Sequence, residues 1–312
     1  MTFQEKRETL VQSKRTESKL LIAAFLVILC FSLLSPVIGM VLLYSGYDKT
    51  TTRVVFEVLN IFSASSLIFV WYSVKSAMNH RELQREYEGE LKNKVFHSVF
   101  YEYLDNCVYG NQYGLSEDIF RSTKIVPETY NVYRSEDRAL GEYKGISVIR
   151  SDLFVQKTGN SFNDRVHTFF KGQMYIFSFK DNFPCNLQII DKKNTIAFDR
   201  KYQFGRKSKN KIKTTNSEFN KLFDIYTAQQ DTINDILTPE LMSMIIAVRE
   251  RLGREASFLF SNNQLIMCLN APQGSYQLDY KGTASEEERK LKSEITDEII
   301  CALSIVDKLM KI

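Results

Sequence analysis

Histidine is the side chain that changes charge most readily near neutral pH, and it is also the commonest metal ligand. The chain has three histidines, His80, His97 and His167. They are far apart, and none forms the HxxxH or HExxH spacing that places two ligands on one helix face. A metal centre would require tertiary convergence that the sequence does not indicate. We therefore predict no metal ion and no cofactor.

The motifs of the common enzyme classes are missing from this sequence. It has no P-loop, no GxGxxG, no GxSxG nucleophile elbow and no kinase signature. Its five cysteines are scattered without a CxxC pair, which is typical of unbridged thiols in a reducing compartment. Many hydrolases lack simple motifs, so these absences lower the expectation of an enzyme without excluding one.

Positive charge is concentrated in one run, RKSKNKIK. Its five cations are Arg206, Lys207, Lys209, Lys211 and Lys213. Next to an anionic membrane surface, each such cation contributes about 1 kcal/mol of attraction. The run is therefore a candidate for binding phospholipid headgroups or another anionic ligand, with a solvated loop as the simpler alternative. Nucleic acid is not expected as a partner, because the net charge of +4 is modest and only Tyr202 and Phe204 supply nearby aromatic rings.

Two apolar segments precede these residues in the chain. Leu20–Gly46 is uncharged, and Val54–Val74 contains only one charged residue, Glu57. A helix rises about 1.5 Å per residue, so each segment is long enough to cross a hydrocarbon core of roughly 30 Å. The sequence therefore predicts a transmembrane hairpin with spans at about 20–44 and 54–74. Glu57 is then either an ion, proton or protomer-contact site or a carboxylate at the membrane interface.

Lysine and arginine lie on both outer flanks of this hairpin, whereas the connecting loop has only Lys49 and Arg53. By the positive-inside rule, both termini and the large C-terminal part face the cytosol. Four segments follow: a cytosolic N-terminal segment at 1–19, the hairpin at 20–74, a juxtamembrane stalk helix at 75–108 and an α+β domain at 109–312. The apolar stripe of the stalk packs either on its own domain or on the stalk of another protomer.

Alternation with a period of two begins after residue 145, while 109–145 is irregular apart from a short helix that Ser116 caps. The expected strands are 145–155, 165–179, 186–190 and 195–198, followed by a hairpin of 256–260 with 264–269. Gly172 is expected at a turn or bulge. No helix between these strands is long enough for a parallel crossover, so the sheet should be mostly antiparallel.

Two helices should flank this sheet. Thr238-Pro239-Glu240 has the hydroxyl cap, the N1 proline and the first-turn acid of a helix start, and Gly253 suits its end. The apolar spacing of residues 286–312 indicates an amphipathic helix. The predicted fold class is α+β: two N-terminal transmembrane helices, then a cytosolic domain with a mostly antiparallel β-sheet and flanking helices.

Several local motifs are shared with a known family. They are Glu136-Asp137 with Gly141, Phe170-x-Gly172, Phe219 with Phe223-Asp224-Ile225-Tyr226, and Leu237-Thr238-Pro239 with Met242. In these motifs the chain resembles a bacterial family of uncharacterised membrane proteins, the domain-of-unknown-function family 3137. The resemblance covers most of the chain and implies a bacterial membrane protein with a cytosolic domain. Together with the predicted hairpin, this gives a multi-pass protein of the bacterial cytoplasmic (inner) membrane. It brings no established catalytic residues.

Asp137 and Glu142 flank Gly141 of these motifs, and their carboxylates are the acids we select for a test of acid–base chemistry. Together with His167 they are the candidate catalytic residues. A turn-stabilising aspartate and a solvated glutamate explain the same two acids without catalysis.

These observations favour a membrane-anchored interaction or scaffold protein, whose α+β domain binds a protein partner near the lipid bilayer. Homo-oligomerisation through the transmembrane or stalk helices is compatible with the same elements. One alternative is a membrane-bound enzyme that uses Asp137, Glu142 or His167 in a cleft. Another is an oligomeric pore or transport component, which two spans can form only by assembly.

Overall fold

The computed structural model of the protein covers most of the chain after residue 48. It describes residues 4–12, 49–123, 125–126, 130–159, 166–193, 211–272, 276, 278 and 282–311, with six single positions between 23 and 45. The side chains of 51–53, 55–70, 73, 76 and 77 are outside the described part. The expected strand at 195–198 also lies outside it.

Among the described residues, no helix has both the length and the apolar character needed to cross a membrane. This finding overturns the predicted transmembrane hairpin, the assignment to the bacterial inner membrane and the multi-pass topology with cytosolic termini. The first predicted span, 20–44, lies almost entirely outside the described residues. The second, 54–74, is not a separate element, because it forms part of the 55-residue helix α2 (Lys49–Tyr103), which continues into a strongly charged half.

The chain forms two compact units. One comprises residues 1–91 and 280–284, and the other comprises 92–279 and 285–312. In the first unit, residues 4–12 are helical. There the Lys6 ammonium bonds the carboxylates of Glu86 and Glu90 at 2.7 and 2.6 Å. The α2 helix ends at Tyr103 in the second unit, within the segment expected to be the stalk.

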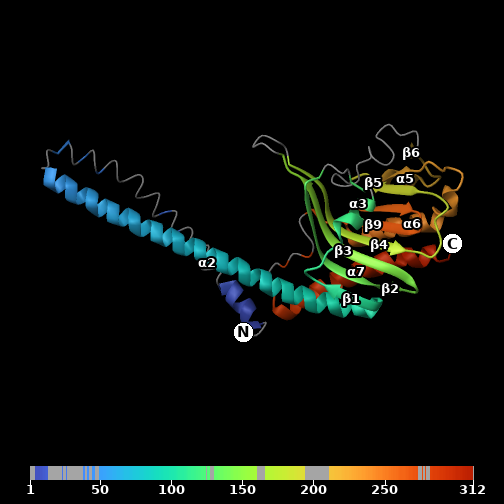
Figure 1. Ribbon diagram of the computed structural model, residues 1–312, viewed down its shortest axis with the longest axis horizontal. Helices are drawn as coiled ribbons and strands as arrows, with labels where there is room; N and C mark the ends of the chain where they lie inside the picture. Colours follow the sequence, from blue (N-terminus) through green and yellow to red (C-terminus); the bar gives the residue numbers. More distant parts are fainter. Residues whose placement is uncertain are drawn as a thin grey trace. The chain divides into compact units, whose positions relative to one another are not determined.

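The second unit is built on a sheet of nine described strands, in the order β1-β2-β3-β4-β9-β8-β5-β7-β6 (Figure 1). The strands are β1 (Asp105–Gly110), β2 (Val132–Tyr143), β3 (Ile146–Lys157), β4 (His167–Ser178), β5 (Leu187–Asp191), β6 (Lys211–Ile212), β7 (Phe223–Tyr226), β8 (Ala256–Ser261) and β9 (Gln264–Asn270). The shorter helices are α3 (Glu117–Ser122), α5 (Ser217–Leu222) and the 3-10 turn η1 (Ile233–Asp235), and the longer ones are α6 (Pro239–Leu252) and α7 (Ala284–Leu309). Every described strand pair is antiparallel, so the α+β class with an antiparallel sheet is observed.

One face of the sheet carries a group of buried polar side chains. Arg150 and Asp152 of β3 share this face because side chains alternate along a strand. The register places Tyr175 of β4 opposite Arg150, and Gln173 opposite Asp152. All four are buried. Helix α7 covers this face, since its Glu298 bonds both Arg150 and Tyr175.

The opposite face is apolar. Its core cluster includes Leu153 and Val155 of β3 and Met174 and Ile176 of β4. Phe120 of α3 packs into the same cluster with 1% of its surface exposed. Burying an apolar side chain of this size contributes about 1.5–3 kcal/mol, so this layer stabilises the second unit.

The helix termini in the second unit follow the predicted signals. Ser116 and Thr238 each accept a hydrogen bond from a backbone amide three residues on, as N-caps do. Gly253 ends α6 in the left-handed conformation, with φ of 61°. The predicted hairpin and C-terminal helix are confirmed as β8–β9 and α7.

Two local predictions were wrong. The region 109–145 was expected to be irregular, but it contains the 12-residue strand β2. A bulge between Glu136 and Ala139 shifts the register of this strand and interrupts its alternation. Gly172 was expected at a turn or bulge, yet it lies in regular pairing within β4, where an added Cβ would overlap the carbonyl oxygen of Leu269. Close approach of β9 therefore explains this glycine.

Candidate functional site

Asp137 lies buried at the bulge of β2, with φ of 55°. Its carboxylate accepts hydrogen bonds from the Lys92 ammonium at 3.0 Å and the Tyr109 hydroxyl at 2.8 Å. Burial alone would lower the pKa of Lys92, but attraction to carboxylates, that of Asp137 first, outweighs burial and raises this pKa. These contacts are those of a structural ion pair.

The other two candidate catalytic residues are exposed and lie far apart. Glu142 pairs with Ser147 between β2 and β3, whereas His167 pairs with Lys157 between β3 and β4. Ser147 and Lys157 are separated by ten residues of β3, or about 30 Å of extended strand. Asp137, Glu142 and His167 therefore do not converge on one site.

The basic run is only partly described. Arg206, Lys207 and Lys209 lie outside the described residues. Lys211 is exposed in β6 and pairs with Asp224 at 2.9 Å, and Lys213 is also exposed. Binding of an anionic ligand or lipid surface by this run stays a prediction.

Among the described residues, three carboxylates lie close enough together to hold a metal ion. Oxygens of Glu136, Asp137 and Asp152 are all within 4.8 Å of one another. Two cations already occupy the group, because Lys92 bonds Asp137 and the Arg150 guanidinium lies 2.6 Å from Asp152. An added metal ion would have to displace these side chains. Asp137 and Asp152 are therefore better explained as part of an ion-pair network, and Glu136 is exposed beside them.

Glu298 of α7 is the centre of this network. Its Oε1 accepts hydrogen bonds from the Arg150 guanidinium at 3.3 and 3.4 Å and from the Tyr175 hydroxyl at 2.8 Å. Its Oε2 accepts from Arg254 at 3.1 Å and from the Tyr276 hydroxyl at 2.5 Å. Both oxygens of this fully buried carboxylate are thus bonded, which offsets the cost of removing its charge from water.

These contacts fix the protonation states around Glu298. Burial by itself raises the pKa of Glu298, but the positive charges of Arg150 and Arg254 outweigh burial and lower it below its usual value. Hydrogen bonds from Tyr276 and Tyr175 act in the same direction. Burial and the nearby carboxylate raise the pKa of Tyr276 well above its usual value. Glu298 is therefore charged and Tyr276 neutral across the physiological range.

The network as a whole balances its charges. Its three cations are Lys92, Arg150 and Arg254, and its three anions are Asp137, Asp152 and Glu298. Aromatic rings complete the enclosure of Arg150, with Phe96 and Phe100 centred 5.2 and 5.8 Å from its guanidinium carbon. Such cation–π contacts stabilise a buried guanidinium that water no longer reaches.

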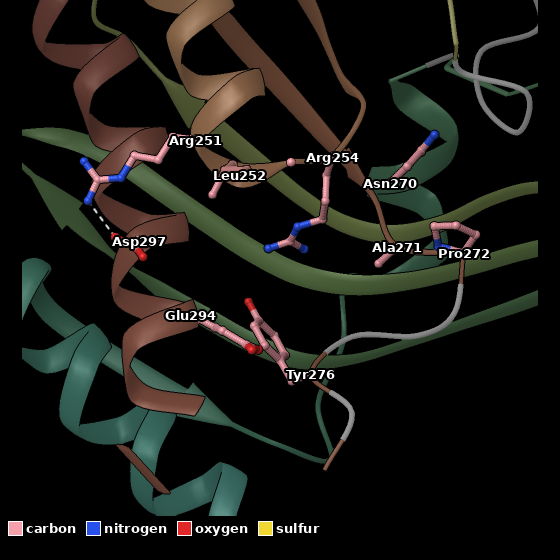
Figure 2. A pocket seen from close by; sticks show the side chains of 10 residues that line it. Arg251, Leu252, Arg254, Asn270, Ala271, Pro272, Tyr276, Glu294 and Asp297 are labelled. Atoms are coloured by element: carbon pink, nitrogen blue, oxygen red, sulfur yellow. Dashed lines mark hydrogen bonds and ion pairs between the residues drawn. The ribbon is translucent and has the colours of Figure 1, made fainter. Parts of the chain in front are cut away.

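An open pocket of about 610 Å³ lies beside Arg254 and Tyr276 of this network (Figure 2). Its walls are Arg251–Arg254 at the end of α6, Asn270–Pro272 after β9, Tyr276, and Glu294 and Asp297 of α7. Figure 2 shows the Arg254 side chain extending into the space between these walls. Pockets of this volume commonly hold small ligands or short segments of a partner.

Two left-handed residues shape the pocket. Gly253 turns the chain at the end of α6 with φ of 61°, and Arg254 follows it directly. Tyr276 has φ of 51°, which costs a residue with a side chain about 1–3 kcal/mol. Its hydroxyl bond to Glu298 and an edge contact with the Phe96 ring at 5.3 Å hold this conformation. Strained residues of this kind are concentrated at functional sites.

Sequence reasoning missed the residues that form this site: Arg150, Arg254, Tyr276 and Glu298. One signal was present in the C-terminal helix. Glu294 and Glu298 are four residues apart, so they share one face, and Glu298 lies beside the buried apolar stripe that includes Ile295 and Ile299. A charged residue at a buried helix position indicates a buried partner, although the sequence does not identify that partner.

Comparison with known proteins supports the sequence resemblance in part. Residues 168–311 match a family described as Protein of unknown function (DUF3137). No curated protein matches the chain. Among solved structures, the crystal structure of the mycobacterial trehalose monomycolate transport factor A, TtfA, aligns with 9% identity and a TM-score of 0.36, over 68% of this chain and 94% of that chain. A likeness this low carries no argument about fold or function.

The family match includes Arg254, Tyr276 and Glu298 of the pocket and its network, but it begins after Arg150. The motif at Glu136–Gly141 also precedes it. The predicted resemblance is confirmed over residues 168–311, where this chain matches the DUF3137 family, whose function is unknown.

Proposed function

We propose that the second unit is a non-enzymatic interaction domain that binds a protein partner at the pocket beside Arg254 and Tyr276. The observation that carries the proposal is a pocket whose ionisable walls are backed by a neutral, hydrogen-bonded charge network. Such a network holds charges in fixed positions before a partner arrives. Preorganised charges improve recognition because less order must be created on binding.

The protonation states favour recognition over proton transfer. A general acid or base works best with a pKa near the working pH. The pKa of Glu298 is lowered by Arg150 and Arg254 against the effect of burial, and that of Tyr276 is raised by burial and by Glu298. Attraction to Glu298 likewise overcomes burial and raises the pKa of Arg254. These groups keep one charge state and suit binding.

The pocket also combines the side-chain types that dominate binding sites. Arginine and tyrosine are enriched among the residues that contribute most to protein interfaces. Arg254 and Tyr276 supply these types, while Leu252, Ala271 and Pro272 add apolar surface. A partner segment that enters the pocket can therefore gain both polar and apolar contacts.

Site-specific photo-cross-linking in the full chain tests this proposal. A benzophenone amino acid replaces Pro272, which is exposed at the pocket, and in a matched variant it replaces Val108, which is exposed on β1 outside the pocket. We expect a defined protein adduct from position 272 only, identified by mass spectrometry, and its loss when Glu294→Lys changes the pocket charge. Equal adducts from both positions, or none from position 272, would contradict the proposal.

A further inference from the structure

The charges that line the pocket indicate what kind of group enters it. Arg251 and Arg254 supply two positive charges, and Glu294 and Asp297 supply two negative ones. Arg251 and Asp297 pair with each other at 2.6 Å at the exposed edge. The other two charged residues of the pocket, Arg254 and Glu294, lie on different elements; Arg254 also bonds Glu298 behind the pocket.

Arg254 is positioned to bind an anion. Its guanidinium donates to Gln173 at 2.7 Å and to Glu298 at 3.1 Å, and these two bonds hold it in place. A guanidinium has five N–H donors, so three are not used by these bonds. Its side chain keeps 24% of its surface exposed. A carboxylate in the pocket can therefore reach a fixed, partly desolvated cation.

Glu294 is positioned to bind a cation. It is exposed at the pocket wall and has no ion-pair partner within the described ranges of the chain. It precedes Glu298 by one helical turn on α7, which places the two Cβ atoms about 5–6 Å apart. Glu294 and the guanidinium of Arg254, which bonds Glu298, therefore line the same pocket from α7 and from the residue after α6.

From this arrangement we infer that the pocket binds a dipolar group, with a carboxylate at Arg254 and an ammonium or guanidinium at Glu294. The inference rests on the proposed function and names the chemistry of the partner segment. A chain end with a C-terminal lysine carries both charges, and a free diamino acid carries the same chemistry. The apolar wall of Leu252, Ala271 and Pro272 suits an aliphatic neighbour.

A set of four probes separates the contributions of the two charges. N-acetyl-leucyl-lysine carries both, its amide carries only the cation, N-acetyl-leucyl-norleucine carries only the anion, and free lysine tests the small-molecule source. Titration calorimetry and ligand-observed NMR with the full chain measure the affinities. We expect the dipolar dipeptide to bind about tenfold more tightly than either singly charged analogue, a difference of ~1.4 kcal/mol.

A matched pair of variants assigns the cationic end. Glu294→Gln should weaken the binding of N-acetyl-leucyl-lysine about tenfold. It should leave the affinity for the norleucine analogue unchanged, because that analogue has no cation to pair with Glu294. Glu218→Gln, which removes an exposed acid on α5, should change neither. If free lysine binds better than the dipeptide, the source is a small molecule, and the dipolar chemistry still holds.

Three results would overturn the inference. If the norleucine analogue binds as tightly as N-acetyl-leucyl-lysine, the pocket binds only an anion. If the lysinamide analogue binds as tightly, the pocket binds only a cation. If no probe binds, the pocket does not bind a dipolar group of this kind. If the probes fail while position 272 still yields a specific adduct, the interaction domain stands and only the ligand class is wrong. Failure of both experiments rejects the pocket as a binding site.

Discussion

Arg150 and Glu298 form an ion pair at 3.3 Å in which neither side chain has exposed surface, although 148 residues separate them in the chain. Arg150 comes from the third strand and Glu298 from the last helix. The pair therefore attaches α7 to the sheet face that it covers. Breaking one partner of such a pair leaves the other charge buried without compensation, whereas replacing both with apolar groups can be close to neutral.

Glu298→Gln should destabilise the second unit strongly. Glutamine has nearly the same shape, but it leaves Arg254 without its carboxylate partner and Arg150 with Asp152 alone. We expect the free energy of unfolding to fall by about 3–5 kcal/mol. Urea unfolding followed by far-UV circular dichroism measures this loss. The neighbouring variant Asp297→Asn, at a partly exposed ion pair, should cost much less. Equal losses would mean that burial of the Glu298 pair contributes nothing.

The stability of the second unit should depend on pH in a direction set by Glu298. The charges of Arg150 and Arg254 overcome burial and lower the pKa of Glu298 in the folded protein, so the unfolded chain takes up this proton first as the pH falls. The stabilisation is complete above the unfolded value of about 4.5 and is lost as the pH falls through the lower folded value.

We therefore expect the difference in unfolding free energy between the parent chain and Glu298→Gln to narrow below about pH 4.5. Urea unfolding at a series of pH values measures it. Tyr276 acts in the opposite range, because its pKa is raised by burial and by Glu298. The contribution of Tyr276 to the free energy of unfolding is complete below the usual tyrosine pKa of about 10 and is lost as the pH rises through the higher pKa of the folded protein. If the difference in unfolding free energy between the parent chain and Glu298→Gln stays constant with pH, Glu298 is not the titrating group.

Local signals in the sequence predicted most of the elements around the site. The Thr238 cap, the Gly253 terminator and the amphipathic spacing of the last helix each depend on residues within one or two turns. The strand β2 was missed because its bulge at Glu136 to Ala139 breaks the period of two. The membrane prediction failed because an apolar stretch was treated as a separate element, whereas the structure continues the second stretch into the charged half of α2.

The site itself could not be predicted from such signals. Arg150 lies in a strand that also contains the charged residues Asp152 and Lys157, and its partner Glu298 is 148 residues away. Only the register of β3 on β4 and the placement of α7 bring Arg150, Tyr175 and Glu298 together. The acids chosen from the sequence, Asp137 and Glu142, were selected for their position beside Gly141. One proves to be buried in an ion pair and the other exposed.

Gly172 should tolerate no side chain, because a Cβ there would overlap a backbone carbonyl of β9 that has no freedom to move aside. We expect Gly172→Ala to cost about 3 kcal/mol or more in urea unfolding. Gly145 is a useful contrast, since its φ of 80° favours glycine but nothing lies within 4 Å of an added Cβ. Gly145→Asn should therefore be mild, because asparagine tolerates the left-handed region. Gly172→Asn should be as damaging as Gly172→Ala, and a mild effect there would contradict the close strand approach.

Tyr276→Phe should weaken the network without removing the ring that packs on Phe96. The variant loses one hydrogen bond to the charged Glu298, and bonds to charged groups contribute about 1.5–3 kcal/mol each. Tyr143→Phe is the matched control, because its hydroxyl bonds the partly exposed Asp307 and should cost less. The decisive measurement is a double-mutant cycle in urea unfolding. Once Glu298→Gln has removed the charge, Tyr276→Phe should cost clearly less than it does alone, because the two residues share one interaction. Additive losses would show that the Tyr276 hydroxyl stabilises the fold independently of Glu298.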